Sequence, residues 1–227
     1  MRIATLFCLI VVSVFSTGPV MAQQPESNGS RQQETLSAEQ LLERLEKRYS
    51  GRSFTADFRQ ESTLEAMDIK DEAFGKTWFK HPGKMRWEYL EPENHVIVSD
   101  GETLWIYRPE DRQVLTGDAV AYFGNGKGAS FLADFGVLKD LFEVSIDERG
   151  QNSVRLKLKP RQTQQELSEV YLEINKQSMD IKQVESVNIY GDVTSIFFEN
   201  QEFDPDMEDS RFEFRIPSGA DVLKMEQ

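Results

Sequence analysis

Histidine and cysteine are the residue types best suited to metal binding and nucleophilic chemistry, and this chain has few of either. His81 and His95 lie on separate predicted elements, and neither has a second ligand at the spacing of a metal site. Cys8 lies in an apolar N-terminal run. No serine occupies a G-x-S-x-G turn, so a hydrolase triad is not indicated. We therefore predict no metal site and no catalytic residue of these classes.

Carboxylates are abundant and could act as acid–base pairs or calcium ligands. The chain has 39 Asp and Glu residues against 26 Lys and Arg residues, and its net charge is −13. In so acidic a chain, neighbouring carboxylates are usually solvated surface groups. The acidity also argues against nucleic acid as a partner, because phosphate-binding proteins carry a basic patch. The candidate groups are Glu166 with Glu169, and Asp204 with Asp206, Glu208 and Asp209.

Three glycines, Gly124, Gly126 and Gly128, are spaced as in a phosphate-binding loop. The sequence around them lacks the Lys-Ser/Thr pair and the strand-then-helix context of such a loop. We interpret them, together with Gly136, as joints of a mobile segment, and we expect no cofactor.

Large apolar side chains are the remaining candidates for binding. A protein core accounts for any one of them. On a curved sheet, however, they indicate a cavity for an apolar ligand, because the inward positions offer few charges. The residues are Trp78, Phe79, Met85, Trp87, Tyr89, Trp105, Tyr107, Tyr122, Phe123, Phe131, Phe135, Phe197 and Phe198.

The elements that position these side chains begin after an N-terminal export signal. Residues 1–22 combine a positive start, an apolar run and a small-residue cleavage site, which indicates a cleaved secretory signal peptide. Residues 23–36 are polar and aperiodic, which predicts a flexible leader. Residues 37–227 suit a single domain. Because Cys8 lies inside the signal, we expect a soluble exported protein without a lipid anchor.

One amphipathic helix is predicted before a long series of strands. Ser37 and Gln40 form a capping box ahead of leucines at helical spacing. From Ser53 the apolar period changes to two, and Asp100-Gly101 is a tight-turn signal. Connections this short favour antiparallel pairing. We predict a strand beginning at Ser53 and further strands at 73–80, 84–90, 95–99 and 103–108.

Residues 118–142 interrupt this rhythm with glycines and with Phe and Leu at helical spacing, which predicts one or two short helices. Strands at 143–147, 153–159, 169–175, 179–190 and 193–203 follow, and an edge strand at 212–217 ends at a proline. About ten or eleven strands with regular turn signals predict a mainly β protein with a few short helices. A barrel or a strongly curved sheet, covered by the helical segments, fits this pattern.

The stretch TWFKHPGKMRWEYLEPENHVIVSDGETLWIYRP, residues 77–109, resembles the LolA family of periplasmic outer-membrane lipoprotein carriers. The likeness spans about residues 38–222 and is strongest over 78–109. Two further motifs match, F-x-x-x-F-x-Q at Phe54, Phe58 and Gln60, and F-x-F-x-x-P-x-G at Phe212, Phe214, Pro217 and Gly219.

The resemblance implies an incomplete antiparallel barrel with a helical lid over a hydrophobic cavity that shelters lipoprotein acyl chains. It implies acylated lipoproteins as cargo, a LolCDE-type inner-membrane ABC transporter as donor and a LolB-like outer-membrane receptor as acceptor. That receptor is itself a lipoprotein. Because the sole cysteine, Cys8, lies inside the predicted signal peptide, a soluble periplasmic carrier is favoured, which we expect to be a monomer and not an enzyme. Three alternatives stay open: a periplasmic lipid-binding sensor or regulator, a carrier of another lipid, and a hydrolase using a carboxylate pair.

The resemblance also implies roles for particular residues. We expect lid side chains to fill the empty cavity, and these are Phe131, Leu132, Phe135 and Leu138. We expect acyl chains to contact Phe79, Met85, Trp87, Tyr89, Val96, Val98, Leu104 and Ile106. Which face of each strand lines the cavity stays open, because register cannot be read from one strand alone.

One position departs from the family pattern. The residue before the turn proline is typically an arginine that holds the lid closed, and here it is His81. A neutral imidazole offers one donor where guanidinium offers five. His81 is therefore either a weaker, pH-sensitive latch or a surface turn residue, and Arg86 could take over the latching role.

Overall fold

The computed structural model describes residues 36–123, 129–162 and 167–225. The predicted signal peptide (1–22), the predicted leader up to residue 35, the three loop glycines and Glu166 lie outside the described residues.

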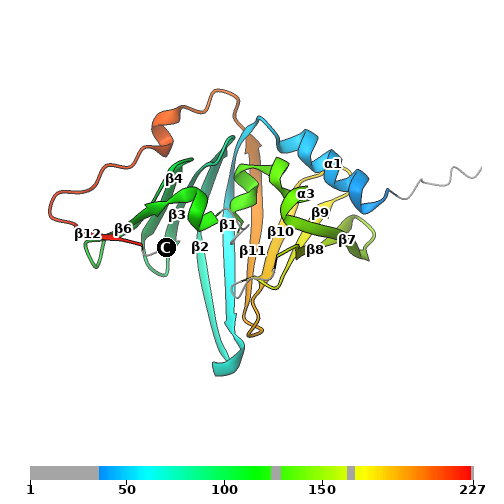
Figure 1. Ribbon diagram of the computed structural model, residues 1–227, viewed down its shortest axis with the longest axis horizontal. Coiled ribbons are helices and arrows are strands. Elements are labelled where there is room, and N and C mark those ends of the chain that lie inside the picture. Colours follow the sequence, from blue (N-terminus) through cyan, green and yellow to red (C-terminus); the bar gives the residue numbers. More distant parts are fainter. Residues whose placement is uncertain (1–35, 124–128, 163–166, 226–227) are drawn as a thin grey trace, which may run out of the picture. The chain divides into compact units, whose positions relative to one another are not determined.

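The described strands form one 12-stranded sheet in the order β12-β6-β5-β4-β3-β2-β1-β11-β10-β9-β8-β7 (Figure 1). Because β12 and β7 stand at opposite ends of this order, the curved sheet is open and no barrel closes. The strands are β1 Ser53–Leu64, β2 Ile69–Lys80, β3 Lys84–Glu91, β4 His95–Asp100, β5 Thr103–Arg108, β6 Gln113–Asp118, β7 Phe142–Arg149, β8 Ser153–Pro160, β9 Glu169–Asn175, β10 Ile181–Val187, β11 Val193–Phe203 and β12 Asp221–Lys224.

This architecture confirms the predicted mainly β fold with an incomplete, curved sheet, and corrects it in three places. β6 was not predicted. Val114 and Leu115 are adjacent apolar residues on opposite faces of the sheet, and both faces are covered, so β6 lacks the alternation of apolar and polar residues that marks a strand with one buried face. β12 pairs in parallel with β6, so the sheet is not wholly antiparallel. Residues 212–217 do not form the predicted edge strand, since 3₁₀ helix η4 (Asp209–Phe212) leads into extended chain without strand pairing.

Helix α1 (Ala38–Tyr49) packs its leucines onto one face of the sheet. Ser37 caps it as predicted, because its hydroxyl accepts the Gln40 N–H while the Gln40 side chain accepts the Ser37 N–H at 2.8 Å. Leu41, Leu42 and Leu45 are buried in the same apolar cluster as the strands. We call this face of the sheet the concave face.

A second layer on the concave face comes from the insertion between β6 and β7. It begins with α2 (Ala119–Phe123) and continues through η2 (Ser130–Ala133), η3 (Phe135–Val137) and α3 (Leu138–Leu141). We call residues 129–141 the lid segment. Its η2 contacts β2 and β3. Its α3 contacts β7, and Figure 1 shows α3 near α1 and β7.

The opposite, convex face is covered at one end by the chain after β11. We call residues 204–225 the C-terminal arm. The Phe214 ring lies 6.0 Å from Trp105 and 5.9 Å from Tyr107, centroid to centroid. Asp209 binds Lys80 at 2.7 Å and Lys84 at 3.0 Å. The β4–β6 region is thus apolar on both faces because protein covers both.

Candidate functional site

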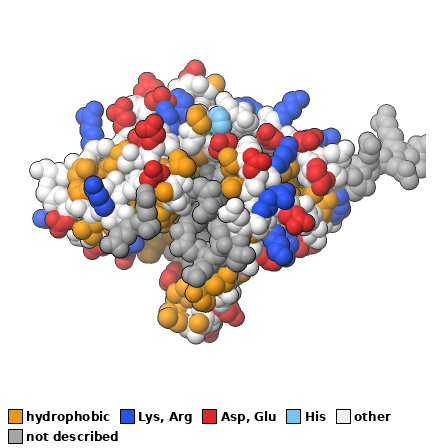
Figure 2. Space-filling view, viewed as in Figure 1, with side chains coloured by type: hydrophobic (Ala, Val, Ile, Leu, Met, Phe, Trp, Pro, Cys, Tyr) orange, Lys and Arg blue, Asp and Glu red, His pale blue; other side chains and the backbone are white. Residues whose placement is uncertain are grey.

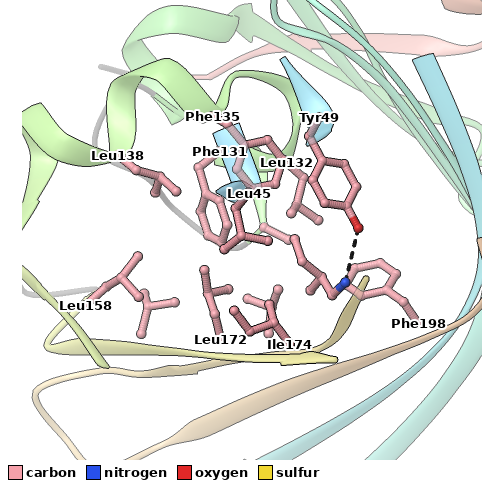
Figure 3. Close-up of a cluster of buried hydrophobic side chains, with 14 of the residues drawn as sticks. Leu45, Tyr49, Phe131, Leu132, Phe135, Leu138, Leu158, Leu172, Ile174 and Phe198 are labelled. Atoms are coloured by element: carbon pink, nitrogen blue, oxygen red, sulfur yellow. Dashed lines mark hydrogen bonds between the residues drawn. The ribbon is translucent and has the colours of Figure 1, made fainter. Parts of the chain in front are cut away.

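An apolar cluster on the concave face is the candidate site. In Figure 3 the lid side chains point toward leucines of α1, β8 and β9. Their exposed fractions are 2% for Phe131, 4% for Leu132, 3% for Phe135 and 0% for Leu138. The four residues expected to fill the cavity therefore lie buried against the sheet.

Tyr49, at the end of α1, contacts both the lid segment and the sheet. Its ring stacks on Phe135 of the lid at 4.7 Å between centroids. Its hydroxyl donates to Gln201 Oε1 at 2.7 Å and accepts the N–H of Ile181 at 3.1 Å. Burial raises the pKa of Tyr49 to about 12, so the hydroxyl stays protonated and keeps both bonds at neutral pH.

Six of the eight predicted cavity residues share the concave face. The register pairs Phe79 with Met85, and Trp87 and Tyr89 follow Met85 at two-residue steps. Across β4, Ser99 opposes both Met85 and Leu104, which places Leu104 and Ile106 on this face as well.

Val96 and Val98 face the other way. They pair with Glu88 and Arg86 on one side and with Tyr107 and Trp105 on the other, all on the convex face. Val98 is fully buried there. These two residues therefore lie on the face that the C-terminal arm covers, and not among the concave cluster.

Strands β8 and β9 also contribute to the cluster, although the predicted cavity residues include none from these strands. Their alternation, SVRLKLK and EVYLEIN, was visible and predicted the strands, but nothing in it indicated that they face the lid. The buried residues are Val154, Leu156, Leu158, Val170, Leu172 and Ile174.

A small pocket opens where the lid meets the strand turns. Its volume is about 160 Å³, and its lining includes Met85, Ser99, Phe123, Phe131 and Leu141. Ligand pockets usually measure about 300–1,000 Å³. The described space is therefore too small for several acyl chains while the lid side chains occupy the concave face.

Comparison with known proteins places this geometry in a family. A family model described as outer membrane lipoprotein carrier protein LolA matches residues 50–215. The chain belongs to the LolA family. An outer-membrane lipoprotein carrier protein of Alkalilimnicola ehrlichii is 31% identical over 172 residues, which are 76% of this chain and 78% of that protein. A protein of the same name from Chromohalobacter salexigens is 29% identical over 193 residues, 85% and 89% of the two chains.

The LolA-family fold also appears among solved structures. An uncharacterized conserved protein from Thermus thermophilus superimposes with a TM-score of 0.55 at 14% identity. The match covers 83% of this chain and 99% of that one. This likeness concerns the fold alone.

His81 of this LolA-family chain lies beside the lid. Its Nδ1 is 3.7 Å from Oδ1 of Asp134, the residue between η2 and η3. That distance exceeds a hydrogen bond, and the buried Nδ1 has no hydrogen-bond partner among the described residues. The adjoining backbone does hold the lid, since the Gly83 N–H donates to the Ala133 carbonyl at 3.2 Å.

Arg86, the other residue considered for latching the lid, lies on the convex face. Its Nε donates to Glu88 at 2.6 Å, and its Nη1 donates to the carbonyl of Arg211 in the C-terminal arm at 3.3 Å. It is therefore placed to hold the arm rather than the lid.

Two of the candidate carboxylates, Glu169 and Asp209, form ion pairs with lysines. Glu169 accepts from the Tyr171 hydroxyl at 2.6 Å and pairs with Lys157 at 2.6 Å, and the Lys157 hydrogen bond holds the pKa of Glu169 below its usual value. Asp209 likewise has a lowered pKa, chiefly because Lys80 donates to it. In the part of the chain that the structure describes, no group of His, Cys, Asp and Glu is placed to hold a metal ion.

Proposed function

We propose that this chain is a periplasmic carrier that shelters the acyl chains of lipoproteins on its concave face and shuttles them from the inner to the outer membrane. The observation that carries the proposal is the burial of Phe131, Leu132, Phe135 and Leu138 where a ligand would lie. Membership in a family of lipoprotein carriers supplies the chemical class of the cargo.

Reversible binding follows from competition for this face. Each buried methylene contributes about 0.8 kcal/mol, so several acyl chains would bind too tightly to an empty apolar cavity. Here the acyl chains must first displace side chains that already bury their own apolar surface. The net affinity is then a difference between two packings, and release remains feasible.

Location and partners belong to the same proposal. The predicted signal peptide supports export to the periplasm. Among the described helices, none is long and apolar enough to cross a membrane. A LolCDE-type transporter as donor and a LolB-like receptor as acceptor would complete the route that the family resemblance implies.

The cargo can be identified directly by native mass spectrometry of the protein purified from its own periplasm. We expect complexes whose added mass is that of triacylated lipoproteins. Recovery of free phospholipid or glycolipid instead would mean that another lipid is carried.

The lid can be tested with the double variant Phe131→Ser/Phe135→Ser. Removing both rings weakens the packing that competes with cargo, so we expect tighter binding of a fluorescent fatty acid and slower transfer of lipoprotein. Phe214→Ser on the convex face is the matched control, because that ring contacts Trp105 and Tyr107 and not the lid. Circular dichroism should show an unchanged β-sheet, and unchanged binding and transfer in the double variant would contradict the lid mechanism.

A further inference from the structure

We propose that the joined ends of the β1–β2 and β10–β11 hairpins form a docking site for a protein that presents an apolar pocket rimmed by Lys or Arg. We call these residues, 61–72 and 188–192, the hairpin tip. This site goes beyond the proposed carriage of acyl chains, because it lies outside the concave cluster and the lid segment.

The hairpin tip exposes several large apolar side chains. Met67 and Tyr190 are each 69% exposed, and Ile189 is 51% exposed. Leu64 and Ile69 form a register pair at the end of β1 and β2 and are also exposed. Figure 2 shows hydrophobic side chains gathered on the projecting end of the β1–β2 hairpin. Exposed apolar patches of this kind are typical of interaction surfaces.

The two hairpins are fixed to each other, so the patch is preorganised. Asp192 Oδ1 accepts the N–H of Glu65 at 3.0 Å, and the Asn188 side chain donates to Asp192 Oδ2 at 2.8 Å. Residues from two distant parts of the sequence therefore share one surface. Less side-chain and loop freedom is lost when such a surface binds a partner.

The charges around the patch indicate the chemistry of that partner. Arg59, just before the tip, is paired with Glu61 and Glu72, which leaves Lys70 as the basic residue of the tip without an ion pair among the described residues. An acidic rim is repelled by anionic lipid, and surface-binding segments are typically basic. It complements a basic rim on a protein, where Tyr and Met are common contact residues. The acidic residues are Glu61, Glu65, Asp68, Asp71, Glu72 and Asp192.

The position of the tip leaves the lid free. β1 runs from Phe54, which contacts Tyr49 beneath the lid, to Leu64 at the tip. The ten residue steps from Phe54 to Leu64 span about 34 Å at about 3.4 Å each. A partner bound at the tip therefore need not touch the lid, so docking and loading can be separate events.

Photo-crosslinking in living cells tests the proposal, with p-benzoylphenylalanine placed at position 67 or 190 of the full chain. Ile216 is the control position, because it is 49% exposed and belongs to the C-terminal arm. We expect one protein adduct from 67 and 190 and none from 216. The crosslinked peptide, identified by mass spectrometry, should contain apolar residues flanked by Lys or Arg.

Charge reversal then distinguishes a specific surface from chance contact. Glu65→Lys/Asp71→Lys should lower the association rate of the purified partner roughly tenfold at low salt, whereas Glu213→Lys/Asp221→Lys in the arm should not. Lipid adducts, adducts with a second copy of this chain, no adduct, or equal labelling at 216 would each overturn the proposal. Phe131→Ser/Phe135→Ser should leave the adducts unchanged, so this proposal and the carrier mechanism can fail separately.

Discussion

A single substitution at His81 could strengthen its contact with Asp134 of the lid segment. We expect His81→Arg to bond the Asp134 carboxylate, because guanidinium reaches farther and offers five donors. Both side chains are about one-third exposed, so the gain is about 1 kcal/mol at most, which corresponds to about fivefold weaker binding of a fluorescent fatty acid. Titration of that probe into the purified protein measures the change.

The matched control for this prediction is His81→Arg combined with Asp134→Asn. Asparagine can still accept the N–H of Gly136, which Asp134 accepts at 3.0 Å, but it carries no charge. The double variant should bind the probe as the wild-type protein does. If His81→Arg alone has no effect, position 81 does not latch the lid.

His95 makes folding stability depend on pH. Its ring stacks on Tyr89 at 3.9 Å between centroids, and burial lowers its pKa, with Arg108 acting in the same direction and Glu93 opposing it. The native state therefore resists protonation more than the unfolded chain does. Stability is unaffected above the unfolded pKa of about 6.5 and falls as the pH drops below it.

Urea unfolding at about pH 7.5 and about pH 5.5 measures this effect. We expect the wild-type protein to lose more stability between these values than His95→Phe, which keeps an aromatic ring against Tyr89 and cannot titrate. Because the two proteins differ only at position 95, the difference between their losses of stability reports His95. Equal losses would show that His95 titrates alike in the folded and unfolded chains.

Residue type alone predicted the site only in part. The four lid residues are large and apolar and lie at helical spacing, which predicted their burial, and all four are buried in the structure. The choice between Val96 and Ile97, or between Leu104 and Trp105, depends on the register of β3, β4 and β5, and both members of each pair are apolar. The convex positions are apolar because the C-terminal arm covers them. The arm lies about 100 residues further along the chain, so its packing on these strands could not be predicted from the local sequence.

At the scale of elements, α1 holds the lid through its last residue. We expect Tyr49→Phe to lower the free energy of unfolding by about 1–3 kcal/mol, because the Ile181 N–H and the Gln201 side chain lose their shared partner. Denaturant unfolding measures the loss, and Tyr190→Phe, at an exposed ring, is the control. A loss no larger than that of the control would mean that water replaces the hydroxyl.

The strands were predictable where one face alone is buried. β9 and β11 have the bounds that alternation predicted. β5 is covered on both faces, and its predicted bounds came from the turn signals on either side of it. In FEFRIP the same alternation does not produce a strand: Phe212 is buried and Phe214 packs on the convex face, while the backbone pairs with no strand. Alternation reports which side chains are covered, and not whether the backbone bonds to a neighbour. β12 escaped prediction because all of its four residues are exposed.

At the scale of the molecule, apolar layers cover both faces of one sheet. We expect the concave layer to bind ligand and the convex layer, under the C-terminal arm, to stabilise the fold. Phe212 belongs to the C-terminal arm, and its side chain is only 1% exposed. We expect Phe212→Ala to lower the free energy of unfolding by about 3–5 kcal/mol, because it leaves a cavity. Probe binding at a temperature where the variant remains folded should be unchanged, because Phe212 is remote from the concave cluster. Altered binding would mean that the two layers are coupled through the sheet.

The middle of the sheet is a seam between β1 and β11, where Phe58 opposes Phe198. These partners are about 140 residues apart in sequence, whereas most other neighbouring strands follow each other along the chain. A chain that emerges N-terminus first presents β1 long before its partner arrives. Until β11 emerges, β1 has a bare edge able to pair with other chains. We therefore expect assembly to be slow and late, and the half-built sheet to be prone to aggregation until β11 has emerged.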